Sequence, residues 1–186
     1  MKTINRKPLF LALAGITALG AAGAAQAVGV NPTGLGDALI YPYYTVRGVL
    51  TGLVGSDAAY NSLLSVVNST ASAKAVKVRF LEGKNSREVL DFNLYLSAKD
   101  VWTTAIIPTT DGAGIFTADK SCTTPTVSSS SAAPTVFVNF AYVGDTGGDT
   151  LDRTREGYVE IIEMGDVVGS TAVAVTHVNG VAPCTA

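Results

Sequence analysis

Residues 74–96 read KAVKVRFLEGKNSREVLDFNLYL, and this stretch decides the fold. Apolar and polar residues alternate through both of its halves, which is the pattern of strands with one buried face. The polar segment 82–86 between the halves contains glycine and asparagine, which adopt the positive φ angles that a tight connection needs. The stretch therefore predicts an antiparallel hairpin in which Phe80 and Phe92 are both buried. The side chains expected to face water are Lys77, Arg79 and Asp91.

Shorter segments on both sides of the hairpin predict further strands. Residues 62–67 are an apolar run, and small polar residues at 69–73 turn the chain back, which gives a third consecutive strand. After the hairpin, 97–100 fits a capping box that would hold one helical turn. Alternation then resumes and ends at Pro108, which lacks a backbone donor. The apolar positions of this fourth strand are Trp102, Thr104 and Ile106. The remaining strands are expected at 39–44, as an edge strand, and at 136–143, 158–164 and 172–178.

Composition and strand spacing together predict the fold class. With 47% hydrophobic and 15% charged residues, the chain is not disordered, and its 186 residues fit one domain. No convincing helical stripe is visible in the exported part. Many short strands with turn signals between them favour an all-β, Ig-like antiparallel β-sandwich of about seven to nine strands over 28–186. Residues 109–134 are rich in Ser, Thr, Gly and Pro and are expected to form a long surface loop without a core element.

The first 27 residues have the layout of a secretory signal peptide. A basic start precedes an apolar run, and Ala25-Gln26-Ala27 supplies an exit of the A-x-A type, so Val28 is the expected mature N-terminus. The alternative is an uncleaved membrane anchor, because no charge occurs from residue 8 through 36. We expect export to the periplasm, the cell surface or the medium, and no transmembrane segment after cleavage.

The charge of the exported part excludes one class of partner. Residues 1–27 contain three of the 13 basic residues and no acidic ones, so 10 basic and 15 acidic residues remain, with a net charge of −5. Nucleic acid is therefore not expected as a partner.

Two cysteines, Cys122 and Cys184, lie in the exported part. An oxidising compartment favours a disulfide between them over two free thiols. Zinc ligation and a redox site are the alternatives, but one histidine and the absence of a C-x-x-C pair leave a metal without a ligand set.

The sequence carries little that points to catalysis. His177, the single histidine, lies in a predicted strand of Val, Thr and Ala, where a structural role is expected. Neither a G-x-S-x-G nor a G-x-G-x-x-G string occurs. We therefore expect a protein that is not an enzyme and that needs no cofactor.

Binding modules are the alternative class. Carboxylates in the glycine-containing loop 144–152 have the oxygen ligands that calcium prefers, but Arg153 and Arg155 follow directly and would pair with them. The three carboxylates are Asp145, Asp149 and Asp152. An aromatic platform for sugar rings would consist of Tyr41, Tyr43, Tyr44 and Trp102. Asn68-Ser69-Thr70 is formally a glycosylation sequon.

Four strings in the chain resemble those of a group of uncharacterised exported proteins from Gram-negative bacteria. They are GDALIYPYY at 36–44, VKVRFLEG at 76–83, SREVLDFN at 86–93 and REGYVE at 155–160. The resemblance implies export but no reaction or ligand. Members of that group continue beyond the position of Cys184, which implies a longer protein and an alternative partner for Cys184.

These observations lead to one functional expectation and one alternative. We expect a non-enzymatic cell-envelope or extracellular structural or interaction module. Its partner would be a protein, an envelope surface or a second copy, bound through the edge strand near Tyr41–Tyr44. The alternative is a carbohydrate- or calcium-binding module.

Overall fold

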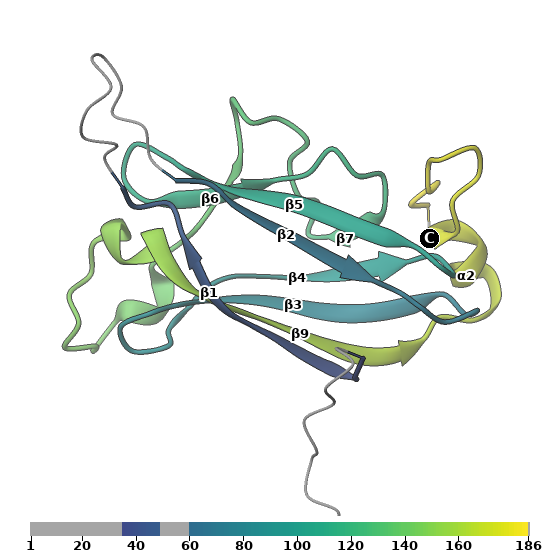
Figure 1. Cartoon of the computed structure of the whole chain (residues 1–186), viewed down its shortest axis with the longest axis horizontal. Helices are drawn as coiled ribbons and strands as arrows, with labels where there is room; N and C mark the ends of the chain where they lie inside the picture. The colour runs from purple at the N-terminus through teal and green to yellow at the C-terminus, as the bar shows by residue number, and fades with distance from the viewer. Residues whose placement is uncertain (1–34, 49–59, 186) are drawn as a thin grey trace, which may run out of the picture. The chain divides into compact units, whose positions relative to one another are not determined.

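The strands form two antiparallel sheets that pack face to face as a sandwich (Figure 1). This computed structural model describes residues 35–48 and 60–185. In the described part nine strands are present, so the predicted all-β sandwich of seven to nine strands is confirmed. The Ig-like identity of the sandwich stays a prediction.

The larger sheet has the order β1-β9-β3-β4-β7, and the smaller sheet has the order β2-β5-β6-β8. The larger sheet consists of β1 (Ala38–Thr45), β9 (Glu156–Asp166), β3 (Lys74–Glu82), β4 (Glu88–Leu96) and β7 (Cys122–Thr124). The smaller sheet consists of β2 (Ser62–Val67), β5 (Val101–Pro108), β6 (Ala113–Phe116) and β8 (Thr135–Val136). Two 3-10 turns, η1 (Phe140–Tyr142) and η2 (Leu151–Arg155), and one short helix, α2 (Gly169–Val175), complete the described elements.

The hairpin predicted from residues 74–96 is present as β3 and β4. Val78 lies opposite Phe92, and Phe80 lies opposite Leu90, so the apolar residues of both strands share one face. Phe80 and Phe92 are both buried, as predicted. Because β9 pairs with the other edge of β3, the hairpin lies at the centre of the larger sheet.

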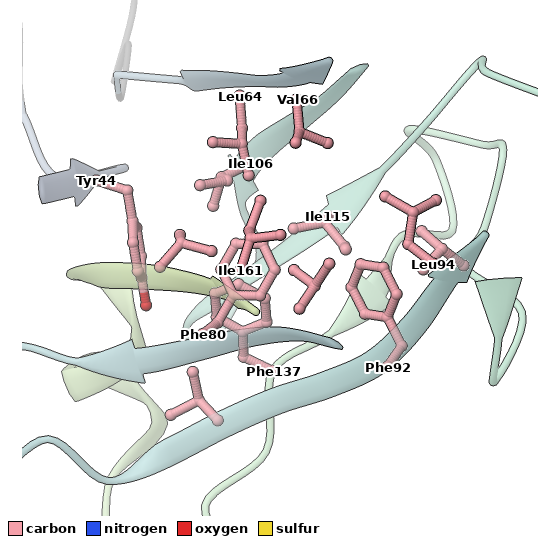
Figure 2. Close-up of a cluster of buried hydrophobic side chains, with 14 of the residues drawn as sticks. Tyr44, Leu64, Val66, Phe80, Phe92, Leu94, Ile106, Ile115, Phe137 and Ile161 are labelled. Atoms are coloured by element: carbon pink, nitrogen blue, oxygen red, sulfur yellow. The ribbon is translucent and has the colours of Figure 1, made fainter. Parts of the chain in front are cut away.

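Aromatic side chains join the two sheets in the core (Figure 2). The ring of Phe80 lies 5.1 Å from that of Phe137 and 6.0 Å from that of Tyr44. Phe92 on β4 contacts Trp102 on β5, with ring centroids 5.7 Å apart. Rings at these separations add to the stability that burial of their surface provides. The hairpin therefore organises the core, and the smaller sheet covers it.

One predicted strand is correct in position but lies in the other sheet. Residues 62–67 form β2, which pairs along its whole length with β5. It cannot extend the hairpin because β4 and β9 already occupy both edges of β3. Residues 97–100 form a turn rather than a helical turn, with Lys99 at φ 58°.

Two further strand predictions are wrong over most of their length. Within 136–143, β8 ends at Val136 and η1 follows; Phe137 and Tyr142 point into the core, whereas Phe140 is exposed. Residues 172–178 overlap α2, which buries Ala174 and packs Val175 into a second buried cluster with Ala73, Cys122 and Ala182. The alternation of small and β-branched residues resembled a strand, but the tertiary contacts stabilise a helix.

The predicted surface loop at 109–134 contains two strands, β6 and β7. Ala113 and Ile115 of β6 are buried in the core. Gly114 lies between them, and a Cβ atom there would come within 2.8 Å of the Thr135 carbonyl oxygen. Glycine at position 114 allows β8 to approach β6 closely. This position therefore does not carry the polar side chain that would have shown the alternation of a strand in the sequence.

The predicted signal peptide, 1–27, lies outside the described residues. Among the residues that are described, no helix is long and apolar enough to cross a membrane.

Candidate functional site

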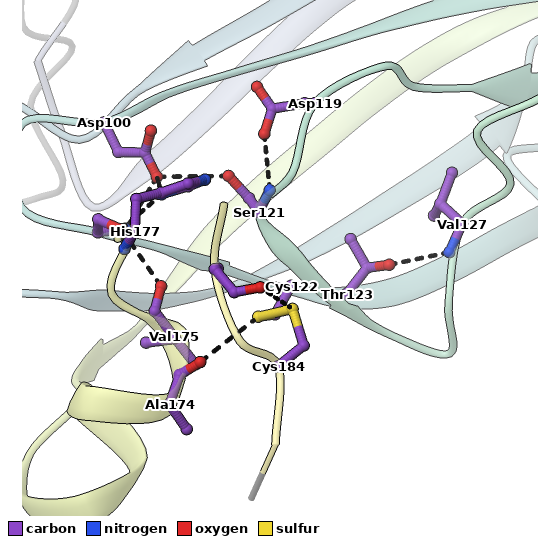
Figure 3. The surroundings of a disulfide bond; sticks show 12 residues. Asp100, Asp119, Ser121, Cys122, Thr123, Val127, Ala174, Val175, His177 and Cys184 are labelled. Carbon is purple, nitrogen blue, oxygen red and sulfur yellow. Dashed lines mark hydrogen bonds and ion pairs between the residues drawn. A yellow bond between two sulfur atoms is a disulfide. The ribbon is translucent and has the colours of Figure 1, made fainter. Parts of the chain in front are cut away.

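The predicted disulfide between Cys122 and Cys184 is present, with an S–S distance of 2.08 Å and a Cα–Cα distance of 5.4 Å (Figure 3). It joins β7 to the segment that follows α2. The backbone N–H of Cys184 also donates to the Ala174 carbonyl at 2.9 Å. The bond therefore holds the C-terminal segment against the larger sheet, and it is consistent with an oxidising compartment outside the cytoplasm.

His177 follows α2 instead of lying in a strand, and it lies beside Asp100 near the disulfide (Figure 3). Its Nδ1 atom lies 2.7 Å from the Ser97 Oγ and 3.2 Å from the Asp100 Oδ2. In a catalytic triad the hydroxyl and the carboxylate occupy opposite nitrogens of the ring. Here both share Nδ1, so this geometry does not activate the serine.

Other contacts in this cluster bind the local backbone. The Ser97 Oγ accepts the backbone N–H of His177 at 2.9 Å, and the Asp100 carboxylate accepts the backbone N–H groups of Ser97 and Val101. The cluster thus fixes the turn at 97–100 to the segment after α2.

Of the three carboxylates proposed for calcium, Asp145 and Asp152 are engaged by arginines, whereas Asp149 takes part in no ion pair among the described residues. Asp145 is buried and accepts hydrogen bonds from Arg153 and Arg87, and the hydrogen bond from Arg153 holds its pKa well below the usual range. Asp152 pairs with Arg47 and Arg155. Within the described part of the chain, no group of three or more His, Cys, Asp or Glu residues is arranged to hold a metal. The pairing with Arg153 and Arg155 that the sequence suggested is therefore present.

The aromatic platform that the sequence left open as an alternative does not form. Trp102 and Tyr44 are buried in the core, and Trp102 belongs to the other sheet. The Tyr41 hydroxyl donates to the Ser65 carbonyl at 2.5 Å. Only Tyr43 of the four keeps an exposed ring. The alternation in β1 breaks at a bulge between Tyr41 and Tyr44, which reverses the expected directions of the side chains.

The sequon at Asn68 is not available for a glycan in the folded protein. The Asn68 side chain is buried and donates to the carbonyls of Ser72 and Ser97, at 2.8 and 2.7 Å.

β1 is an edge strand, as predicted, and pairs with β9 alone. β1 contains Pro42 and a bulge in its pairing with β9, and the Tyr41 hydroxyl donates to the Ser65 carbonyl of β2. Prolines and bulges are devices that protect sheet edges from further pairing. The edge is therefore less open to a partner than the sequence suggested.

A feature that sequence reasoning missed is the outer face of the smaller sheet. None of the residues of β2, β5, β6 and β8 is charged. Leu63 is 84% exposed, and the register places Val67 directly opposite Val101 on the same face. Ser65 lies opposite Thr103 between them. We call these outward residues the uncharged face; they are Leu63, Ser65, Val67, Val101, Thr103, Ala105, Ile107, Phe116 and Val136.

The uncharged face is hollowed by a shallow groove of about 440 Å³. Leu63, Thr103 and Phe116 line it. A count of charged residues strand by strand, once the strands are assigned to sheets, would have revealed this face.

Comparison of the chain with protein-family models and with curated proteins finds no match. The resemblance to exported Gram-negative proteins stays a prediction, and function has to be argued from the geometry.

Proposed function

We propose that this chain is an exported, non-enzymatic structural module that binds a second copy of itself through the uncharged face. The observation that carries the proposal is the absence of charge from all four strands of one sheet, combined with the exposure of Leu63, Val67, Val101 and Val136. A contiguous apolar patch on a soluble protein commonly marks an interaction surface. The disulfide supports a location outside the cytoplasm.

A second copy is the partner that this surface fits best. In a two-fold contact the same patch meets itself, so a face without charges needs no complementary charges on its partner. The ion pairs among the described residues lie on the larger sheet and in loops, and the two sheets of a sandwich are about 10 Å apart. Face-to-face contact would therefore keep the like net charges of two copies apart. Ser65 and Thr103 would supply hydroxyl groups to the centre of the contact.

The experiment is sedimentation of the purified protein from about 1 to about 100 µM. We expect reversible dimers, and Leu63→Glu should weaken the association by at least about tenfold because it would bury an unpaired carboxylate. Val143→Glu is the matched control, since Val143 is an equally exposed aliphatic residue in a loop.

A third variant separates this proposal from association through the edge. Ile40 is an exposed residue of the edge strand β1. If Ile40→Glu weakens the dimer and Leu63→Glu does not, association uses the edge and our proposal is wrong. A protein that remains monomeric over the whole range also overturns it.

A further inference from the structure

A cavity of about 610 Å³ lies beside the turn of the β3–β4 hairpin. The loops that carry η1 and η2 lie at this same end of the sandwich (Figure 1). The cavity is lined by residues of β1, β9, η2 and the hairpin turn, and it does not involve the uncharged face. Its volume lies within the range of about 300 to 1,000 Å³ that is typical of small-molecule sites.

Paired charges hold the walls of the cavity in place. Arg153 donates to Glu82 and to Asp145, both at 2.9 Å, and Glu82 is fully buried. Glu82 also accepts the backbone N–H groups of Lys84, Asn85 and Arg87, which fixes the hairpin turn.

A second, more exposed group of paired charges also lines the cavity. Arg47 donates to Asp152 at 2.8 Å and to Glu156 at 3.0 Å. Because these groups already have partners, their positions do not depend on a ligand, and the polar walls are preorganised.

One positively charged side chain at the cavity has no ion-pair partner among the described residues. Three carboxylates line the cavity, and their direct ion-pair partners are three arginines. The carboxylates are Glu82, Asp152 and Glu156, and the arginines are Arg47, Arg153 and Arg155. Arg153 also pairs with Asp145, which does not line the cavity and is itself paired with Arg87. Lys84 is additional: its ammonium group donates to the Gly147 carbonyl at 2.7 Å, and it has no ion-pair partner among the described residues. The cavity therefore offers one positive charge with unused donors.

Aromatic rings form a further part of the wall. The bulge in β1 places Pro42 and Tyr43 across from Tyr158 of β9, because Tyr41 pairs with Val159 and Tyr44 with Gly157. Tyr43 and Tyr158 both line the cavity, and Tyr43 has an exposed ring whose hydroxyl donates to Glu156 at 3.3 Å. Each ring combines an apolar face with a polar tip.

We propose that this cavity binds a saccharide unit that carries a carboxylate, such as a hexuronic acid. The tyrosine rings would contact the apolar C–H face of the sugar, and the polar walls would bond its hydroxyl groups. The Lys84 ammonium group would pair with the carboxylate, which is a stronger contact than a neutral hydrogen bond. This proposal gives a specific ligand class to the carbohydrate-binding alternative from the sequence, and it does not depend on the proposed self-association.

The test is titration of the isotope-labelled protein, followed by amide NMR, with glucuronate, galacturonate, glucose, galactose and acetate. The amide signals of Gly83, Gly147 and Gly157 report on the cavity, and the whole spectrum shows whether each variant is folded. We expect the uronates to shift these signals with dissociation constants of about 1 mM, and the neutral sugars to bind at least about fivefold more weakly.

Matched variants identify the residues responsible. Lys84→Gln should weaken uronate binding about tenfold, and Tyr43→Ala should weaken it for every sugar. Lys99→Gln is the control for the first, because Lys99 also donates to a backbone carbonyl, that of Ser69, away from the cavity. Tyr60→Ala is the control for the second, since Tyr60 is exposed and does not line the cavity.

The proposal is overturned by any of three results. Acetate that binds as well as the uronates would show a site for anions alone. Neutral sugars that bind as well as the uronates would exclude recognition of the carboxylate. Uronates that leave the cavity signals unshifted up to about 20 mM would exclude the site.

Discussion

On the outer face of the larger sheet, basic side chains of β3 pair with acidic side chains of β4 and β9, whereas the outer face of the smaller sheet carries no charged side chain. Arg79 contacts Glu88 at 2.8 Å on one side and Glu160 at 3.0 Å on the other. Lys77 forms an ion pair with Asp91. The inner faces of the two sheets, in contrast, are alike, because both contribute apolar side chains to one core.

Under the proposed function, this difference assigns stability to one sheet and recognition to the other. Exposed ion pairs contribute about 0 to 1 kcal/mol each, but they keep the larger sheet solvated. Exposure of an apolar face to water does not stabilise the isolated domain. The composition of the outer face of the smaller sheet is therefore better explained by contact with another molecule. The following predictions compare the core, to which both sheets contribute apolar side chains, with the outer faces, which differ in charge.

The largest effect is expected where the sheets are equivalent, in the shared core. Phe92→Ala should lower the free energy of unfolding by about 3 to 5 kcal/mol, because it removes a ring that lies between β4 and Trp102 of β5. Urea denaturation measures this. A variant that unfolds at nearly the parental urea concentration would show that the hairpin does not organise the core.

Loss of the disulfide should cause the next largest decrease in the free energy of unfolding. On the chain-entropy model, a bond across 62 residues contributes about 4 kcal/mol, and strain in the folded protein would reduce this figure. The double variant Cys122→Ala/Cys184→Ala should therefore lose about 3 to 4 kcal/mol in urea denaturation. Reductant should have the same effect on the parent and none on the variant. A parent that is indifferent to reductant would contradict the structural role of the bond.

Disruption of the buried ion pairs among Glu82, Arg153 and Asp145 at the hairpin turn should cause the third largest decrease in stability. Glu82→Gln should cost about 3 kcal/mol, because it leaves Arg153 buried with less compensation. The control is Glu156→Gln, since Glu156 pairs with Arg47 at the surface. Equal losses of stability in the two variants would exclude a special role for the buried pair.

The same cluster predicts the effect of acid. Burial opposes the ionisation of Glu82, but hydrogen bonds from Arg153 and from backbone N–H groups outweigh it and lower its pKa. A carboxyl group with a lowered pKa stabilises the fold above its unfolded pKa and loses this contribution as the pH falls. Unfolding measured between about pH 6 and about pH 3 should show declining stability, and Glu82→Gln should flatten the decline. A parallel decline in both proteins would contradict this assignment.

The smallest effects on stability are expected on the outer faces, where the sheets differ. Asp91→Asn on the larger sheet should cost less than about 1 kcal/mol, and Leu63→Glu on the smaller sheet should change the monomer by about 0.5 kcal/mol or less. Only the second should change self-association. If both variants alter association equally, the difference between the two faces has no functional meaning.

Local patterns were sufficient for the elements that depend on neighbouring residues. The alternation in 74–96 correctly predicted the hairpin and the burial of Phe80 and Phe92. The pairing of Cys122 with Cys184 followed from there being only two cysteines in the exported part. The aromatic platform, which was only an alternative to the edge strand, does not form because a bulge that alternation does not reveal turns Tyr44 into the core.

The sequence by itself therefore determined the fold class, the central hairpin and the disulfide, because period-two alternation is a local signal and the exported part of this sequence contains a single pair of cysteines. Only the tertiary structure decided which strands share a sheet, that 169–175 is helical, and that Arg47 and Lys84 lie at one cavity with Tyr158. These features depend on contacts between residues far apart in the chain, such as Arg47 and Asp152, which are 105 positions apart. Such contacts form and contribute to stability only once the sheets have packed. A local sequence pattern therefore cannot predict them.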